Sequence, residues 1–229
     1  NIITDMPTIN LYNIDCMEFM RNVPDKHYDL AIVDPPYGIG EANEKRMQSR
    51  HHSQRKYKGG DWDKFSPEIV YFNEIKRVSK NQIIWGTNHF ISTMPFDSPC
   101  WIFWDKDQYG DFADGELAWT SFSTALRKFR FTWNGFRKQI PENRIHPTQK
   151  PVALYDWIYK NYLPNGGKVL DTHGGSMSNL IAALKAGNIE MHVYEIDKDY
   201  FKDAKQRVEL FQSQGNLFAE SQKIEWISF

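Results

Sequence analysis

The chain has 229 residues, of which 41% are hydrophobic and 25% are charged. This length and composition are typical of one globular domain with a core of its own. No apolar run approaches the length that crosses a bilayer, so we expect no membrane span and no membrane partner. Cys16 and Cys100 are the two cysteines, and neither has a CxxC or zinc-type spacing. We therefore expect no disulfide framework, no metal site and a reducing cytoplasm as the setting.

The formal net charge of −1 does not by itself indicate a nucleic-acid-binding protein. Basic residues are nevertheless concentrated in two stretches. The first comprises Lys45, Arg46, Arg50, Arg55, Lys56 and Lys58, and the second Arg127, Lys128, Arg130, Arg137 and Lys138. Aromatic residues such as Phe129 and Trp133 lie within the second stretch, and this combination suits stacking on nucleic-acid bases. Either stretch is equally compatible with a solvated surface.

Apolar runs in the first half of the chain predict strands and a helix. Residues 30–33 form a continuous apolar run, which predicts a buried strand that stops at Asp34. Ser66-Pro67 predicts a helix start, with serine as N-cap and proline at the first helical position. The helix continues through Ile69, Phe72, Ile75 and Val78. Two more apolar runs predict strands at residues 82–85 and 100–104.

The C-terminal third alternates helices and strands. The pattern predicts a helix over 152–162, a strand at 169–170, a helix through 180–184 ending at Gly187, a strand at 191–194 and a helix over 201–211. Asp197 is a candidate cap for the last helix. This alternation predicts an α/β fold with a largely parallel sheet and helices on both faces. Residues 105–144 have weak periodicity, so we interpret them as an insertion in a single domain spanning 1–229.

Asp34-Pro35-Pro36-Tyr37 follows the first predicted strand, at the end of a sheet strand where ligands bind in α/β folds. The prolines fix the backbone and leave the Pro35 carbonyl free to accept a hydrogen bond. A carboxylate, a rigid carbonyl and an aromatic ring together suit a planar substrate with an amino group. A strand that simply ends in a proline turn is the structural alternative.

Two further short sequence motifs contain candidate site residues. Asp171-Thr172-His173-Gly174-Gly175-Ser176 is a turn before a helix, where glycine lets the backbone approach a ligand. Glu195 ends the next strand, about twenty residues on, where an acidic side chain can accept from ribose hydroxyls. The third string, His146-Pro147-Thr148-Gln149-Lys150-Pro151, stands just before a predicted helix.

These strings, in this order, resemble the amino-methylating DNA methyltransferases, in particular their β arrangement. In that arrangement D-P-P-Y precedes a target-recognition insertion, then H-P-T-Q-K-P, and the turn that binds S-adenosylmethionine (AdoMet) comes last. The resemblance covers nearly the whole chain and is closest to small phage- or prophage-type stand-alone enzymes. It also includes residues 13–16, 85–88 and 116–120. It implies a Rossmann-like AdoMet-dependent methyltransferase sheet with permuted motif order.

The resemblance also implies roles for individual residues. Asp34 and the Pro35 carbonyl, with Pro36 beside them, would accept hydrogen bonds from the target amino group, and Tyr37 would stack on the extruded base. The implied cofactor site comprises Asp15, Cys16, Asp34, Thr148, Lys150, Asp171, His173, Gly175, Ser176 and Glu195. Thr148 and Lys150 would lie near the methionine moiety, and Asp15 with Cys16 near the adenine. The two basic stretches are candidates for contacts with double-stranded DNA.

The implied activity is methyl transfer from AdoMet to N6 of adenine in DNA, because D-P-P-Y is commoner among adenine enzymes. N4-cytosine methylation is the alternative. Methionine stands at position 177, where family members usually have glycine, and a side chain there would crowd the cofactor or require an unfavourable backbone conformation. A DNA-binding pseudoenzyme or partner subunit weakened in AdoMet binding is therefore a second alternative. Because family members often dimerise, a homodimer is one candidate assembly, and a cognate restriction enzyme is a candidate further partner.

Overall fold

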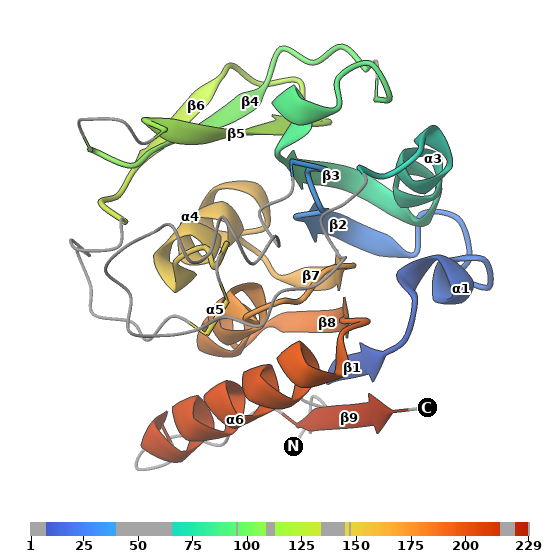
Figure 1. Cartoon of the computed structure of the whole chain (residues 1–229), viewed down its shortest axis with the longest axis vertical. Coiled ribbons are helices and arrows are strands. Elements are labelled where there is room, and N and C mark those ends of the chain that lie inside the picture. The colour runs from blue at the N-terminus through green and yellow to red at the C-terminus, as the bar shows by residue number, and fades with distance from the viewer. Residues whose placement is uncertain are drawn as a thin grey trace.

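The computed structural model describes residues 8–39, 66–94, 96–108, 113–133, 145–146, 148–215 and 223–228. In this part of the chain nine strands form one sheet, in the order β6-β4-β5-β3-β2-β7-β8-β1-β9 (Figure 1). They are β1 (Ile9–Asn13), β2 (Tyr28–Val33), β3 (Ser79–Trp85), β4 (Trp101–Asp105), β5 (Gly115–Thr120), β6 (Arg127–Arg130), β7 (Gly167–Asp171), β8 (Ile189–Tyr194) and β9 (Ile224–Ser228). The predicted α/β class is confirmed.

The sheet is largely parallel, as the sequence predicted. β2 pairs in parallel with β3 on one side and with β7 on the other, and β8, β1 and β9 continue in the same direction. Among the described strands only β5 runs antiparallel to its neighbours, β3 and β4. The carboxyl ends of the parallel strands therefore share one edge of the sheet with the amino end of β5. This is the edge at which α/β sheets bind ligands.

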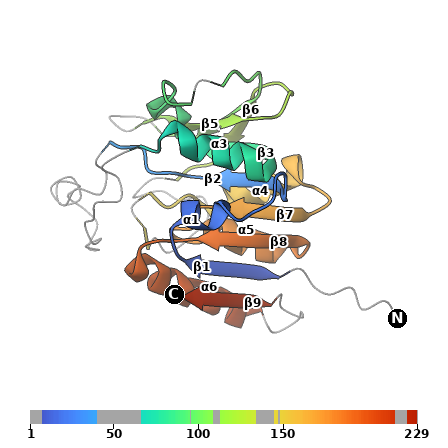
Figure 2. The ribbon, with the colours of Figure 1, turned by 90° about the vertical axis from the view of Figure 1, so that its right-hand side faces the viewer.

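Helices cover both faces of the sheet (Figure 1). α4 (Val152–Tyr162), α5 (Ser178–Ala186) and α6 (Lys198–Gly215) contribute to the larger apolar core on one face. α1 (Cys16–Met20) and α3 (Ile69–Val78) pack on the other face, and they lie in front of the strands in Figure 2. A short 3-10 helix, η1 (Thr87–His89), follows β3. Within the described ranges no helix is both long and apolar enough to cross a membrane.

The clearest sequence patterns correspond to the best-covered elements. The four residues 30–33 of β2 are at most 1% exposed, because helices cover the strand on both faces. α5 ends at Gly187, whose φ of 76° is a left-handed conformation that glycine adopts without strain. Asp197 Oδ1 accepts hydrogen bonds from the backbone N–H groups of Asp199 and Tyr200, so its predicted role as a helix cap is confirmed.

The predicted helix start at Ser66-Pro67 is wrong. Residues 66–68 are not helical, and α3 begins at Ile69. Glu68 occupies the N-cap position, and its side chain makes no capping hydrogen bond. The apolar side chains of Phe72, Ile75 and Val78 are fully buried against the sheet. Packing of this face, rather than a cap, therefore stabilises the helix.

The segment 105–144, for which the sequence predicted no regular elements, contributes two strands to the same sheet. β5 lies between β3 and β4, and β6 pairs in parallel with β4 at the sheet's end. β1, β9 and α1 also lie where the sequence predicted no element. The proposal that this segment reads the DNA sequence stays a prediction.

Candidate active site and cofactor site

The predicted acidic residues lie together at the carboxyl edge of the sheet because each stands at the end of a parallel strand. Asp34 directly follows β2, Asp171 is the last residue of β7, and Glu195 directly follows β8. Because β5 runs in the opposite direction, its second residue, Glu116, arrives at the same edge. Lys150 precedes α4 and reaches the site from the face that α4 covers.

Asp34, Tyr37 and Lys150 form one hydrogen-bonded cluster. The Tyr37 hydroxyl donates to Asp34 Oδ1 at 2.7 Å and accepts from Lys150 Nζ at 3.1 Å. Lys150 Nζ also donates to Asp34 Oδ2 at 2.5 Å. Burial raises the pKa of Asp34, the Lys150 ammonium lowers it and Glu116 raises it, with a net rise above the ordinary value. The sequence analysis grouped Lys150 with the cofactor residues, whereas in the structure its ammonium donates to the Asp34 carboxylate.

Backbone shape at the end of β3 positions the Tyr37 ring. Gly86 has a φ of 73°, and a Cβ atom built there would lie 2.0 Å from Tyr37 Cε1. Only glycine therefore admits the ring at this distance. His89 is another neighbour, and its ring stacks on Tyr37 with centroids 4.9 Å apart and planes 17° apart. The resemblance included Gly86 only within residues 85–88, and His89 was not among the predicted site residues.

Glu116 and Lys106 complete the ionic cluster. Glu116 Oε2 lies 3.1 Å from Lys150 Nζ, and its Oε1 lies 2.6 Å from Lys106 Nζ. Burial raises the pKa of Glu116, but the two lysines lower it by more than burial raises it. The net result is a pKa of about 2. The Glu116 carboxylate is therefore ionised at neutral pH and lies between two ammonium groups. Neither Lys106 nor Glu116 was among the predicted site residues.

Asp171 anchors the turn that the sequence assigned to the cofactor. Its Oδ2 accepts from Asn179 Nδ2 at 2.9 Å, and its Oδ1 accepts from the His173 backbone N–H at 3.1 Å. Burial nevertheless raises the pKa of Asp171 to about 6, because these hydrogen bonds only partly compensate for lost hydration. His173 is kept neutral, since burial lowers its pKa to about 4 against an opposing effect of Asp15.

Glu195 closes the other side of this turn. Its Oε2 accepts from the Gly175 backbone N–H at 2.8 Å, and its Oε1 accepts from the Asp197 N–H at 2.9 Å. Burial raises the pKa of Glu195 to about 7 in spite of both bonds. Beside it Gly175 has a φ of 49°, and a Cβ atom there would meet only the His173 carbonyl oxygen, at 3.9 Å. The turn therefore leaves room for a ligand next to a carboxylate.

Met177 adopts the unfavourable conformation that the sequence predicted for a side chain at this position. Its φ and ψ are 59° and 28°, in the left-handed region, at the N-cap of α5. The side chain is 1% exposed and belongs to the apolar core on the α4–α5–α6 face. The Met177 side chain packs against Gly174: a Cβ atom built on Gly174 would lie 2.7 Å from the Met177 sulfur. The methionine thus packs into the core.

The remaining predicted cofactor residues come from the start of α1, the segment before α4 and the turn itself. Asp15 is the N-cap of α1, and its Oδ1 accepts from the Met17 N–H at 2.8 Å. Cys16 is buried, and burial with the charge of Asp15 raises its thiol pKa to about 12. Thr148 Oγ1 lies 3.0 Å from Nδ1 of His146, which is itself buried. Ser176 is buried, and its carbonyl accepts from Arg207 Nη1.

The predicted DNA contacts are only partly described. Arg127, Lys128 and Arg130 are exposed on β6, at the end of the sheet. Lys128 lies 3.4 Å from Asp105, and Arg130 lies 2.5 Å from Asp107. Each of these two basic side chains therefore forms an ion pair with an aspartate. Eight residues of the two basic stretches lie outside the described residues: Lys45, Arg46, Arg50, Arg55, Lys56, Lys58, Arg137 and Lys138.

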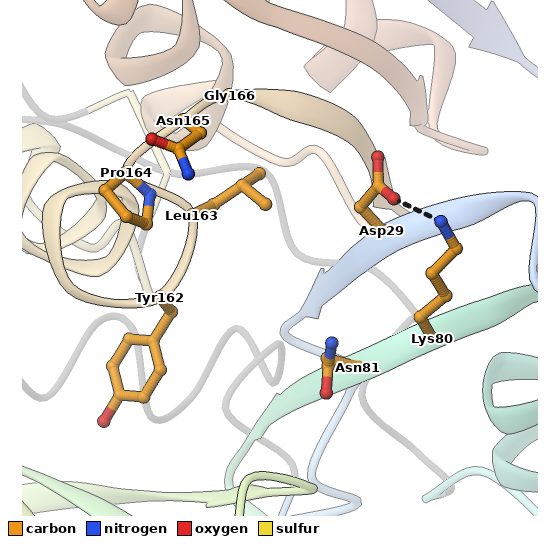
Figure 3. A pocket seen from close by; sticks show the side chains of 8 residues that line it. All are labelled: Asp29, Lys80, Asn81, Tyr162, Leu163, Pro164, Asn165 and Gly166. Atoms are coloured by element: carbon orange, nitrogen blue, oxygen red, sulfur yellow. Dashed lines mark hydrogen bonds and ion pairs between the residues drawn. The ribbon is translucent and has the colours of Figure 1, made fainter.

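A surface hollow at the opposite edge of the sheet has no part in this site. It is lined by Asp29, Lys80, Asn81 and residues 162–166, with Asp29 and Lys80 joined by an ion pair (Figure 3). Asp29 and Lys80 lie near the amino ends of β2 and β3, whereas Asp34 follows the carboxyl end of β2. The hollow contains none of the residues predicted for catalysis or cofactor binding.

Comparison with known proteins identifies this arrangement. The sequence model of the N6 and N4 methyltransferases, described as DNA methylase, matches residues 100–206. The type II methyltransferases M.ScaI of Streptomyces caespitosus and M2.MboI of Moraxella bovis are 23% and 25% identical to the chain, over 87% and 79% of it and 81% of each relative. The chain is therefore similar in sequence to amino-methylating DNA methyltransferases.

A solved structure, the M1.HpyAVI–SAM complex, resembles this chain with a TM-score of 0.53 at 22% identity. The likeness covers 87% of this chain and 98% of that one. It confirms the predicted Rossmann-like fold, and that protein was solved as a complex with SAM, the cofactor expected here. The residues present fit that cofactor, because the Gly175 turn offers room beside two carboxylates, Asp171 and Glu195, whose burial is only partly offset by hydrogen bonds from the protein.

Proposed function

We propose that this methyltransferase modifies N6 of adenine in double-stranded DNA after the target base leaves the helix. The observation that carries the proposal is the Asp34 carboxylate beside Tyr37 at the carboxyl edge of the sheet. The family includes both N6-adenine and N4-cytosine enzymes. The D-P-P-Y form of the motif favours adenine, since S-P-P-Y is commoner among cytosine enzymes.

Asp34 has the chemistry that amino methylation requires. The exocyclic nitrogen of adenine is a weak nucleophile because its lone pair is delocalised into the ring, and it gains positive charge as it attacks. AdoMet, when bound, supplies a methyl group activated by a sulfonium. The Asp34 carboxylate and the Pro35 carbonyl would accept hydrogen bonds from the amino group and stabilise the developing charge more than the ground state. Direct displacement of this kind requires no covalent enzyme intermediate.

Tyr37 would hold the extruded base. Removing a base from the stack costs a few kcal/mol, and stacking on an aromatic side chain contributes about 1–3 kcal/mol in return. The ring is held by hydrogen bonds of its hydroxyl with Asp34 and Lys150 and by the close backbone of Gly86. This fixed orientation would reduce the entropy lost when a base binds.

The product of the reaction tests the proposal directly. The purified protein is incubated with AdoMet and methylation-free genomic DNA, and the DNA is digested to nucleosides for mass spectrometry. N6-methyladenine is the expected product. N4-methylcytosine would preserve the chemistry and replace the proposed base. Absence of both, while a relative with glycine at the position of Met177 methylates the same DNA, would favour the pseudoenzyme or partner-subunit alternative.

The affinity for AdoMet is expected to rise with pH between about 6 and 8, because Glu195 would bind ribose hydroxyls as a carboxylate. Its pKa is raised by burial to about 7, so at lower pH the ligand-free protein carries a proton that binding must release. The expected loss approaches tenfold for each pH unit below the pKa. Calorimetry at several pH values, in buffers of different ionisation enthalpy, measures both affinity and proton release.

Glu195→Gln is the control for this pH dependence. The variant is expected to bind AdoMet more weakly and to lose the proton release near pH 7. An affinity of the unaltered protein that stays constant from pH 6 to 8 would contradict the assignment of Glu195 to the ribose.

The DNA contacts and further partners are proposed on the same basis. The two basic stretches, 45–58 and 127–138, would bind phosphates, which position DNA without specifying its sequence. The segment 105–144 would read the target sequence. Because two of its relatives, M.ScaI and M2.MboI, are type II methyltransferases, we also propose a cognate restriction enzyme in the same cytoplasm, and a homodimer as the working assembly.

A further inference from the structure

Lys150 is a buried cation that uses all three of its N–H donors within the site. Its side chain is 2% exposed. The donors reach Asp34 Oδ2 at 2.5 Å, the Tyr37 hydroxyl oxygen at 3.1 Å and Glu116 Oε2 at 3.1 Å. An ammonium without such partners would not be retained at this depth. Lys150 is therefore shared between two carboxylates from different strands.

Asp34, the first of these carboxylates, would also have to bind the target amino group. If Asp34 accepts from the target amino group, as proposed above, the base must take a place that the Lys150 ammonium occupies in the ligand-free site. Both partners are hydrogen-bond donors with positive or developing positive charge. Asp34 cannot give its full acceptor strength to the base while Lys150 remains 2.5 Å from it.

Glu116 is positioned to keep its contact with the Lys150 ammonium when Asp34 binds the target base instead. It is ionised, it already contacts Lys150 Nζ, and its second oxygen is fixed by Lys106 at 2.6 Å. The ring of Trp104 lies beside Lys106, with the ammonium 4.9 Å from its centroid, so this anchor is itself supported by β4. Glu116 and Asp34 are 24% and 21% exposed, so both carboxylates border the opening of the site.

We propose that Glu116 is a positioning residue for methyl transfer: it retains the Lys150 ammonium and so releases the Asp34 carboxylate to the target amino group. This inference rests on the proposed function in one respect, the role of Asp34 as acceptor. It assigns to β5, in the segment between the catalytic and cofactor motifs, a direct effect on the chemistry.

Glu116→Gln removes the charge and keeps the size of the side chain. Lys150 then has Asp34 as its one carboxylate partner among the described residues, and the target amino group competes less well. We expect single-turnover methyl transfer to fall by about tenfold to a hundredfold, the range of coupling between contacting charged groups. The affinity for AdoMet is expected to be unchanged, because Glu116 lies on the side of Asp34 away from the glycine turn.

The pH profile separates positioning from a purely structural effect. The charge of Glu116 raises the pKa of Asp34, so its removal should shift the acid limb of the transfer rate to lower pH. Glu116→Asp keeps the charge and should keep the acid limb in place. Glu190→Gln is the matched control. Glu190 in β8 forms an ion pair with Lys168 in β7 at 3.1 Å, and both residues are remote from the site.

The experiment measures transfer of radiolabelled methyl groups from AdoMet to methylation-free genomic DNA between pH 5 and 9, together with thermal unfolding of Glu116→Gln, Lys150→Met and the double variant. Slower transfer, a shifted acid limb and non-additive changes in Tm support the proposal. An unshifted limb with an unchanged rate, or additive changes in Tm, would overturn it. If the unaltered protein transfers no methyl group, the proposed function fails, and the Tm cycle alone decides the link between Glu116 and Lys150.

Discussion

Asp34→Asn is expected to lower the rate of methyl transfer by about 10²–10³-fold, the usual effect of removing one preorganised group that faces transition-state charge. Asparagine preserves the shape of the side chain and one acceptor oxygen. It lacks the negative charge, and hydrogen bonds to an ionised acceptor are about twice as strong as neutral ones. Single-turnover transfer of radiolabelled methyl groups to DNA measures the effect without interference from product release.

Binding of AdoMet shows whether this loss is specific. Glu116 and the Tyr37 hydroxyl still satisfy Lys150 in Asp34→Asn, so the fold and the cofactor site should persist. Asp29→Asn is the matched control, because Asp29 lies at the other end of β2 and pairs with Lys80 at 2.7 Å. A rate for Asp34→Asn close to that of the unaltered protein, with AdoMet bound normally, would refute the role of Asp34 as acceptor.

Met177→Ala is expected to destabilise the protein by about 2–5 kcal/mol, which corresponds to a fall in Tm of about 4–20 °C. The side chain is 1% exposed, and its truncation leaves a cavity between α5 and the Gly174 turn. Alanine keeps a Cβ atom, so the variant retains the strained left-handed backbone while losing the packing. Thermal unfolding and urea titration measure the change.

Met177→Gly separates packing from backbone strain. Glycine leaves the same cavity but relieves a conformation that costs about 1–2 kcal/mol for other residues. We therefore expect the order of stability methionine, glycine, alanine. Glycine less stable than alanine would mean that the left-handed backbone carries no strain. Because Met177 packs into the core, neither variant should bind AdoMet more tightly than the unaltered protein; a gain would show that methionine crowds the cofactor.

The sequence predicted the central elements because their apolar content is continuous. β2, β3, β7 and β8 are buried between layers of helices, and such strands contain runs such as 30–33. β1 and β9 were missed because polar residues such as Asn10 and Glu225 interrupt them. β6 contains Arg127, Lys128 and Arg130, and only its pairing with β4 marks it as a strand.

The same reason explains what was predicted of the candidate site. Asp34, Asp171 and Glu195 were predicted together because each stands at the end of a recognisable parallel strand. The contact of Lys150 with Asp34 joins residues 116 positions apart and depends on how α4 packs. Glu116 was missed because an antiparallel strand brings its beginning, and not its end, to the ligand-binding edge.

The hairpin of β4 and β5 constrains which insertions and deletions this protein can tolerate. Asp105 pairs with Gly115 and Trp104 with Glu116, so Lys106 and Glu116 are brought together by the alignment of two strands. A slip of one residue would turn Glu116 to the other face of the sheet. Changes in length between residues 106 and 115 that preserve this alignment would leave the ionic cluster intact. Insertions and deletions that shift this pairing are expected to break the contact of Lys106 with Glu116.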